Sequence, residues 1–238
     1  MPGGTYSALS GMMSRLDQLD RLAADLANLN TPGYKTERSA TNAAERDGFA
    51  ALLNSAVDVV DGGSKIDLHP GTINGTGRDL DVAIDGNAFF VIGSAKNPHL
   101  TRSGNFTRRA DGLLTTLEGD AVLDDQNRPI KLGEGKVTID ADGTVRAGDS
   151  VAATLKLVNY DEKDLVRESG ARFRALPGAK PTKADATLVP RSLEQSNVTA
   201  VDRMVTLTEV RRGFEALQKG ITTLHDMDGQ AITQLGRR

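Results

Sequence analysis

Apolar residues near both ends of the chain recur at alternating spacings of three and four. In the amino-terminal stretch they are Leu9, Met12, Leu16, Leu19, Ala23 and Leu26. In the carboxy-terminal stretch they are Leu207, Val210, Phe214, Leu217, Ile221 and Leu224. A period of about 3.5 residues places each set on one stripe of a helix, which is the seam of a coiled coil. The pattern predicts two terminal amphipathic helices with these stripes as candidate assembly interfaces.

A turn is predicted directly after the first helix, at Thr31, Pro32 and Gly33. Proline disfavours the helical conformation at the residue before it, and glycine accepts a positive φ. We therefore expect the helix to end near Asn28, the triplet to act as a turn or hinge, and Gly33 to have a positive φ.

The hydrophobic period changes from Leu80 onwards. Leu80, Val82 and Ile84 alternate with polar or small residues, which is typical of a half-buried strand. Three Asp-Gly pairs, Asp85-Gly86, Asp111-Gly112 and Asp142-Gly143, follow such stretches and predict tight turns between antiparallel strands. The central part of the chain is therefore expected to be a compact antiparallel β domain.

These patterns together predict an α+β fold, with paired N- and C-terminal coiled-coil helices, a central antiparallel β domain and extended connectors. The expected divisions are the first helix in 1–35, a connector in 36–79, the β domain in 80–175, a return arm in 176–198 and the last helix in 199–238. A simpler alternative is that both helices belong to the core of an ordinary α+β domain. The long polar stretches between helices and β segment count against it, because compact domains usually have short connections.

Composition narrows the class of protein. Among 238 residues there is no Cys and no Trp, aromatic residues are 4% and the net charge is -3. A thiol nucleophile is excluded, and the lack of a basic stripe argues against nucleic acid as a partner. The longest apolar runs are too short for insertion into a membrane, and the first residues do not form the apolar region of a cleaved signal. Without cysteines, both cytosol and periplasm remain open.

Candidate catalytic and metal-binding groups each have a plainer explanation. His69, His99 and His225 lie far apart, and we expect each to be a solvated surface side chain. The Asp140–Gly143 stretch begins like a calcium loop but lacks its later ligands, and Gly133–Lys136 lacks the spacing of a phosphate loop. No catalytic residue, cofactor or metal site is therefore expected.

Four separate blocks of the sequence resemble the bacterial flagellar rod and hook proteins. The first pair of motifs, Tyr6–Met12 and Leu26–Lys35, is similar to the amino-terminal signature of that family. The stretch Leu80–Ile92 looks like its central signature, and Leu100–Phe106 with Asp111–Leu113 also fits. Leu193–Val198, followed by Arg212–Glu215 and Lys219, resembles its carboxy-terminal signature. The order of the blocks is that of the family, and the amino-terminal motif adds Asn28 to the candidate interface.

The resemblance implies a structural role and no enzymatic activity. In the family the terminal helices pair into an inner tube, and the rod crosses the periplasm and transmits torque from motor to hook. The implied partners are other rod proteins, further copies of the chain and the flagellar type III export apparatus, which exports subunits without a cleaved signal. The modest β domain favours a proximal rod type. The alternatives are a distal rod type, a hook-type axial protein and a β-rich hydrolase that uses paired carboxylates.

Overall fold

The computed structural model describes the backbone of residues 2–39, 64–182 and 184–235, and the side chains of residues 11–38, 65–182 and 184–223. The chain divides into two compact units. We call the first, Met1–Leu26 with Ser39–Ser64 and Thr199–Arg238, the helical unit, and the second, Ala27–Arg38 with Lys65–Val198, the β unit. The predicted α+β class is confirmed by two long helices and a mainly antiparallel β unit.

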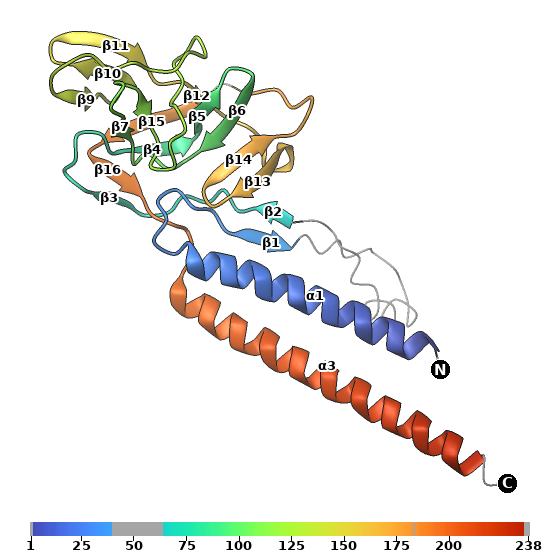
Figure 1. Ribbon diagram of the computed structural model, residues 1–238. Helices are drawn as coiled ribbons and strands as arrows, with labels where there is room; N and C mark the ends of the chain where they lie inside the picture. Colours follow the sequence, from blue (N-terminus) through green and yellow to red (C-terminus); the bar gives the residue numbers. More distant parts are fainter. Residues whose placement is uncertain (1, 40–63, 183, 236–238) are drawn as a thin grey trace. The chain divides into compact units, whose positions relative to one another are not determined.

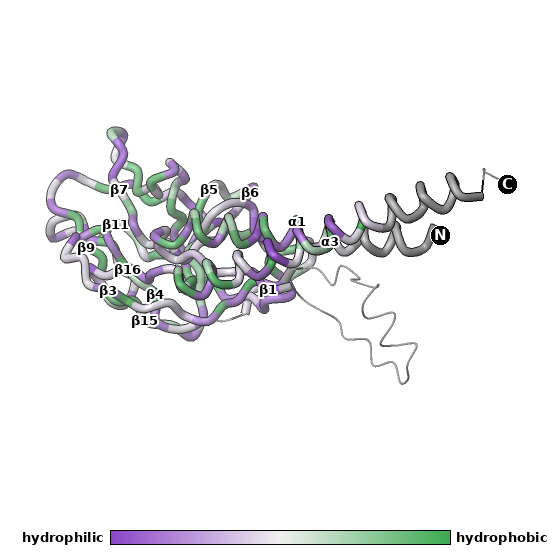
Figure 2. The backbone as a smooth tube through the Cα atoms, turned by 90° about the horizontal axis from the view of Figure 1, so that it is seen from below, coloured by the Kyte–Doolittle hydropathy of each residue, from purple (hydrophilic) through white to green (hydrophobic). Residues whose placement is uncertain are grey.

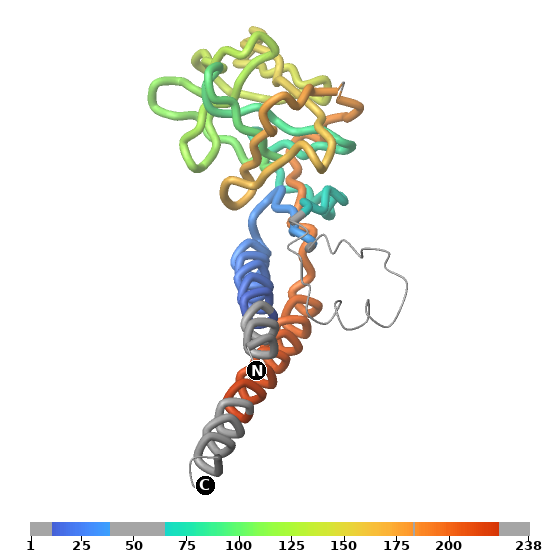
Figure 3. The backbone as a smooth tube through the Cα atoms, turned by 90° about the vertical axis from the view of Figure 1, so that its right-hand side faces the viewer, coloured from blue at the N-terminus to red at the C-terminus, as the bar shows by residue number. Residues whose placement is uncertain are grey.

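The helical unit contains α1, Pro2–Ala27, and α3, Ala200–Leu235, which lie side by side and antiparallel (Figures 1 and 3). Asp25 near the end of α1 pairs with Arg203 near the start of α3, with an Nε–Oδ2 distance of 3.2 Å. At the other end of the contact, a Cβ placed on Gly11 would lie 3.6 Å from Leu217 Cδ1. In the coloured parts of both helices, hydrophobic and hydrophilic positions alternate, as an amphipathic pattern requires (Figure 2).

The β unit is made of short strands in several small sheets. The largest sheet has the order β12-β5-β6-β14-β13, formed by β12 Leu157–Val158, β5 Phe89–Ser94, β6 Asn97–Thr101, β14 Arg172–Ala175 and β13 Leu165–Ser169. A three-stranded sheet has the order β11-β10-β9, formed by β11 Ser150–Thr154, β10 Thr144–Ala147 and β9 Val137–Ile139. A short 3-10 turn, η1, spans Glu162–Asp164.

Four two-stranded sheets complete the described architecture. They pair β1 Glu37–Ser39 with β2 Ser64–Ile66, β3 Ile73–Gly75 with β16 Ser192–Glu194, β4 Val82–Asn87 with β15 Asp185–Pro190, and β7 Thr107–Arg108 with β8 Leu114–Thr115. Three of these pairs bring residues from outside 80–175 into the β unit. Most of β1 and β2 lies in that unit, β3 and β16 pair with each other, and β15 pairs with β4.

The core has two parts, which lie on opposite faces of strand β5. Neighbouring strand residues point to opposite faces, so Phe89 and Phe90 enter different clusters. Phe90 packs edge-on against Phe106 with ring centroids 5.1 Å apart, and Phe89 packs against Phe173 at 5.7 Å. The five-stranded sheet is therefore covered by apolar side chains on both sides.

Two of the three predicted Asp-Gly turns are confirmed. Asp111-Gly112 connects β7 to β8 and Asp142-Gly143 connects β9 to β10, with positive φ at both glycines. The turn predicted at Asp85-Gly86 is wrong, since Gly86 lies inside β4 and the chain continues into β5, which belongs to another sheet. A Cβ at Gly86 would lie 2.5 Å from the carbonyl oxygen of Asp185 in the paired strand. Glycine is needed there for close packing of two strands and not for a reversal of the chain.

Candidate functional site

Among the residues of the predicted seam of the last helix, Leu217 lies close to Gly11 of α1. Val210 is buried, and Leu207, Phe214, Leu217 and Ile221 are half-buried. The side chain of Leu224 lies outside the described residues. Gly213 lies on the same face of α3, and a Cβ added there would lie 3.2 Å from the guanidinium carbon of Arg15.

The predicted seam of the first helix is less covered. Met12, Leu19 and Leu26 are half-buried, whereas Leu16 is 46% exposed and Ala23 is exposed. The side chain of Leu9 lies outside the described residues. The most buried apolar residue of α1 is Leu22, at 6% exposed, which the heptad pattern leaves out of the seam.

The turn after α1 is docked on the β unit. The Thr31 hydroxyl donates to Asn28 Oδ1 at 3.0 Å, and the Thr31 amide donates to the Asn28 carbonyl at 3.1 Å. Pro32 is followed by Gly33, whose φ of 69° confirms the predicted positive value. The Gly33 amide donates to the Glu194 carbonyl at 2.8 Å, and a Cβ at Gly33 would lie 2.4 Å from the Arg102 carbonyl carbon. Both the backbone conformation and the available space therefore require glycine.

Three buried charged residues, Lys35, Arg102 and Glu194, form what we call the ionic triad. One carboxylate oxygen of Glu194 accepts from Lys35 Nζ at 2.5 Å, and the other accepts from Arg102 Nε at 2.7 Å. The side chains of Lys35 and Glu194 are fully buried and that of Arg102 is 2% exposed. A single carboxylate thus joins a segment near residue 35, a β strand near residue 102 and a segment near residue 194.

The remaining hydrogen-bonding groups of the triad also have partners. Lys35 Nζ donates to the His69 carbonyl at 2.7 Å, and the Gly71 amide donates to Glu194 at 2.9 Å. The Arg102 guanidinium donates to the carbonyls of Ile84, Gly86 and Ala88. Buried charges are tolerated only when they are paired and hydrogen-bonded in this way. Burial lowers the pKa of the Lys35 ammonium, while the charge of Glu194 acts in the opposite direction.

Further contacts hold the segment after α1 beside the segment before α3. The Thr36 amide donates to Asn197 Oδ1 at 2.8 Å, and Asn197 Nδ2 donates to the Asp67 carbonyl at 2.9 Å. The guanidinium of Arg167 lies over the Tyr34 ring at 4.5 Å and pairs with Glu37 at 2.6 Å. Within the β unit, the two chain ends that continue into α1 and α3 are therefore fixed as neighbours.

Sequence reasoning did not single out the ionic triad. Lys35, Arg102 and Glu194 each lie in a different one of the family-like blocks, which were assessed as whole motifs. One sequence feature could have indicated a buried charge. In each motif a charged residue is flanked by glycine, apolar or hydroxyl residues, as in Gly33-Tyr34-Lys35-Thr36. Only the fold shows that the three charges meet.

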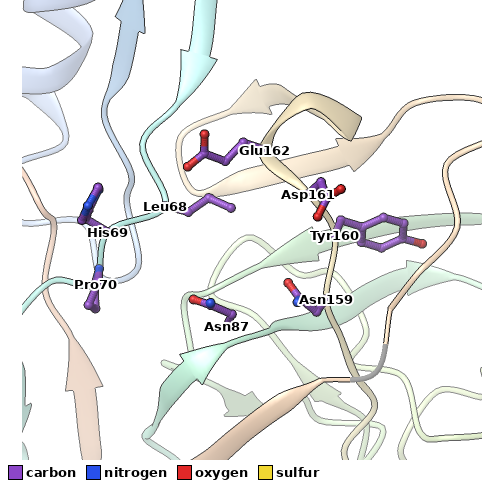
Figure 4. A pocket seen from close by; sticks show the side chains of 8 residues that line it. All are labelled: Leu68, His69, Pro70, Asn87, Asn159, Tyr160, Asp161 and Glu162. Carbon is purple, nitrogen blue, oxygen red and sulfur yellow. The ribbon is translucent and has the colours of Figure 1, made fainter.

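Two cavities are described in the β unit, and neither brings two carboxylates face to face. One, of about 360 Å³, is lined by Leu68, His69, Pro70, Asn87, Asn159, Tyr160, Asp161 and Glu162. Figure 4 shows His69 and Pro70 on one side and the Asn159–Glu162 segment on the other. Its two carboxylates are consecutive residues of one segment and do not face each other across the cavity. A second cavity, of about 260 Å³, includes Thr31, Pro32 and Arg172 among its lining residues.

The histidines differ from one another in exposure. His69 is mainly exposed and pairs with Asp67. The expectation that His99 is solvated is wrong, because its side chain is 13% exposed and its Nδ1 lies 2.5 Å from Glu168 Oε2. The side chain of His225 lies outside the described residues. Across the described part of the chain, no three potential metal ligands gather, and no helix is both long and apolar enough to span a membrane.

Three family models match successive parts of this sequence. The model described as "Flagella basal body rod protein" matches residues 6–35, that of the "Flagellar hook protein FlgE/F/G D1 domain" matches 83–147, and that of the "Flagellar basal body rod FlgEFG protein C-terminal" matches 189–235. Each matched segment contributes one residue of the ionic triad.

Full-length relatives agree with these matches. The flagellar basal-body rod protein FlgF of Caulobacter vibrioides is 30% identical over 243 residues, covering 100% of this chain and 99% of the relative. FlgF of Rhizobium meliloti is 32% identical over 247 residues, covering 99% of each. The chain belongs to the flagellar basal-body rod protein family.

This rod protein is of the FlgF type and is a structural subunit rather than an enzyme. Flagellar basal-body rod proteins FlgG are also similar to it. That of Bacillus subtilis is 31% identical over 249 residues, covering 92% of this chain and 93% of the relative.

Proposed function

We propose that this rod protein is built into the rod through α1 and α3, which pair as a coiled coil and pack against neighbouring subunits to transmit torque. The observation that carries the proposal is the ionic triad, to which each family-matched segment contributes one residue. A fixed spacing between the segments that enter the two helices is what a subunit needs to present both helices together. The apolar seam of α3 supplies the buried surface for such packing.

The test is rod assembly in cells whose own copy is replaced by a variant. Leu217→Lys places a charge in the half-buried seam of α3, so rods and swimming should be lost. Gln218→Lys adds the same charge at the exposed neighbouring position and should leave both unchanged. Normal basal bodies with Leu217→Lys would contradict assembly through this helix.

The location proposed is the proximal part of the rod in the periplasm, with export by the flagellar type III apparatus and no cleaved signal. FlgF-type relatives that match from end to end support the proximal position. The similarity to FlgG proteins makes the distal rod the alternative. Labelling the protein in isolated basal bodies distinguishes the two by its position along the rod. Sequencing the amino terminus of the incorporated protein tests export, since loss of the first residues would contradict an uncleaved subunit.

A further inference from the structure

The larger of the two described cavities is built from three segments that are far apart in the sequence. Residues 68–70 follow β2, Asn87 ends β4, and the Asn159–Glu162 segment follows β12 (Figure 4). All of these residues belong to the β unit. The volume of about 360 Å³ falls within the range of roughly 300–1,000 Å³ that is usual for small-molecule sites. The cavity is therefore large enough to hold a small ligand.

The backbone of each wall is fixed by hydrogen bonds to other parts of the β unit. The His69 carbonyl accepts from Lys35 Nζ of the ionic triad at 2.7 Å. The Asn159 carbonyl accepts from the Thr182 amide at 2.8 Å, and Asn87 is the last residue of the β4–β15 ladder. A site whose walls are already formed loses less free energy to ordering when a ligand binds.

Several polar groups that line the cavity have no partner among the described residues. The side-chain amides of Asn87 and Asn159 make no hydrogen bond there, and the Glu162 carboxylate forms no ion pair. Each amide offers two N–H donors and one acceptor oxygen. Leu68 adds apolar surface to the same cavity and packs on the core cluster that contains Phe89. The cavity thus combines an apolar wall with groups that both donate and accept hydrogen bonds.

The charges around the cavity narrow the class of ligand. Its described lining residues include Asp161 and Glu162 but no lysine or arginine, so a phosphate or a carboxylate would be repelled. Asp161 is already paired with Lys163 at 3.4 Å, and no three potential metal ligands gather in the described part of the chain. A neutral ligand with hydroxyl groups fits better, because each hydroxyl both donates and accepts.

We propose that this cavity binds a neutral saccharide. The hydroxyl groups of the sugar hydrogen-bond to the amides of Asn87 and Asn159, and the C–H face of its ring packs on Leu68. A basic side chain would pair with Glu162 but would leave the amide N–H donors and the apolar wall unused, so the saccharide is favoured. The inference goes beyond the proposed function and does not depend on it, since every lining residue belongs to the β unit.

The test is a titration of the purified, isotope-labelled full chain, followed by nuclear magnetic resonance of its side-chain amides. Maltotriose and chitotriose are the neutral probes, trilysine is the cationic probe and inorganic phosphate the anionic one. Asn159→Ala removes one amide but keeps the backbone pairing with Thr182, so this variant should fold. Asn74→Ala is the matched control, because Asn74 is exposed on β3 and does not line the cavity. Glu162→Gln keeps the shape of the side chain and removes its charge.

The expected result is a saturable shift of the Asn87 and Asn159 side-chain signals with at least one of the two sugars. Asn159→Ala should weaken this binding about tenfold, which is the loss of a ligand hydrogen bond, and Asn74→Ala should leave it unchanged. Glu162→Gln should also retain it, because a neutral ligand does not need the charge.

Several results would overturn the inference. They are no saturable shift with either sugar, equal affinity of the wild type and Asn159→Ala, or shifts confined to residues outside the cavity. Binding of trilysine that is lost in Glu162→Gln, without a response to either sugar, would assign the cavity to a cationic ligand instead. Binding of phosphate in place of sugar would show that the carboxylates do not exclude anions.

Discussion

Glu194 accepts hydrogen bonds from three different segments through one carboxylate. Its partners, Lys35 and Arg102, are both cations in the interior of the β unit. Removal of the carboxylate leaves two buried positive charges without a counterion, which is far more costly than removal of a surface ion pair. At the residue scale, the stability of the β unit therefore depends on this one side chain.

The first prediction concerns this carboxylate. Glu194→Ala should lower the free energy of unfolding by about 3–5 kcal/mol, because the two cations stay buried and unpaired. Glu118→Ala is the control, since Glu118 pairs with Arg172 but is 60% exposed, and it should cost about 0–1 kcal/mol. Urea denaturation of the full chain followed by far-ultraviolet circular dichroism measures both. Similar unfolding midpoints for the two variants would contradict a structural role for the triad.

The second prediction separates two reasons for glycine. Gly33 and Gly77 have φ values of 69° and 75°, but a Cβ at Gly77 would have no neighbour within 4 Å. Gly77→Ala should cost roughly 1–2 kcal/mol, which is the strain of the left-handed conformation alone. Gly33→Ala should cost clearly more, since its methyl group would overlap the Arg102 backbone. Thermal unfolding of both variants gives the difference, and equal costs would show that the backbone of residue 102 can move aside.

At the scale of the elements, periodicity predicted the helices well and the sheets less well. A heptad pattern needs only local sequence, so both helices could be predicted directly, while the two seams as assembly interfaces stay a prediction. Gly86 shows the limit of local patterns. An Asp-Gly pair by itself predicts a turn, and only the neighbouring strand reveals that this glycine is needed for close strand packing instead. That neighbour, β15, comes about a hundred residues later. The ionic triad could not be predicted for the same reason, since Glu194 lies 159 positions from Lys35 and 92 from Arg102 in the sequence.

The third prediction contrasts the two faces of α1. Leu22→Ala removes a side chain that is 6% exposed and should destabilise the helix pair by about 2–5 kcal/mol. Leu16→Ala removes one that is 46% exposed and should change the stability of the monomer by about 0.5 kcal/mol or less. Amide hydrogen exchange of α1 in dilute protein reports the difference. Equal loss of protection would place both leucines on the same face.

The fourth prediction is a pH dependence of the turn at Asp124. Burial acts to raise the pKa of Asp124, but hydrogen bonds from Arg128 and Gln126 outweigh it and hold that pKa below its ordinary value. The unfolded chain therefore takes up this proton first as the pH falls, and the stabilisation present above about pH 4 is lost in acid.

Asp124→Asn tests this dependence directly. The variant should be less stable than the wild type at pH 7, and the gap should close as the pH falls below about 4. Asp125→Asn, at the exposed neighbouring position, should run parallel to the wild type throughout. Thermal unfolding midpoints between pH 7 and pH 3 measure the gap, and a gap independent of pH would exclude the carboxylate as its cause.

At the scale of the whole molecule, sequence reasoning found the α+β class and the helices at both ends. It placed the β domain within 80–175, whereas the β unit also takes in Ala27–Arg38 and the stretch up to Val198. The polar composition and scattered prolines of residues 176–198 led to the prediction of a return arm there. Its strand β15 is nevertheless the antiparallel partner of β4 along six residue pairs.

The fifth prediction follows from this boundary. A fragment of residues 27–198 should unfold cooperatively, because it contains β15, β16 and the complete ionic triad. A fragment of residues 80–175 lacks β15, the partner strand of β4, and should not unfold cooperatively. Val82 and Ile84 are almost fully buried in the whole chain and would be exposed at an unpaired edge in this fragment. Circular dichroism melts compare the two, and a cooperative transition in the shorter fragment would restore the narrower boundary.

The sequence separation of Lys35 and Glu194 also determines how long Lys35 remains without its counterion during synthesis of the chain. The two residues are 159 positions apart, and ribosomes add roughly 5–20 residues per second. Lys35 therefore waits on the order of ten seconds during synthesis before its counterion exists. Throughout that interval the growing chain cannot form this ion pair. The position of Glu194 late in the sequence therefore means that the buried charge of Lys35 can be paired only when most of the chain has been synthesised.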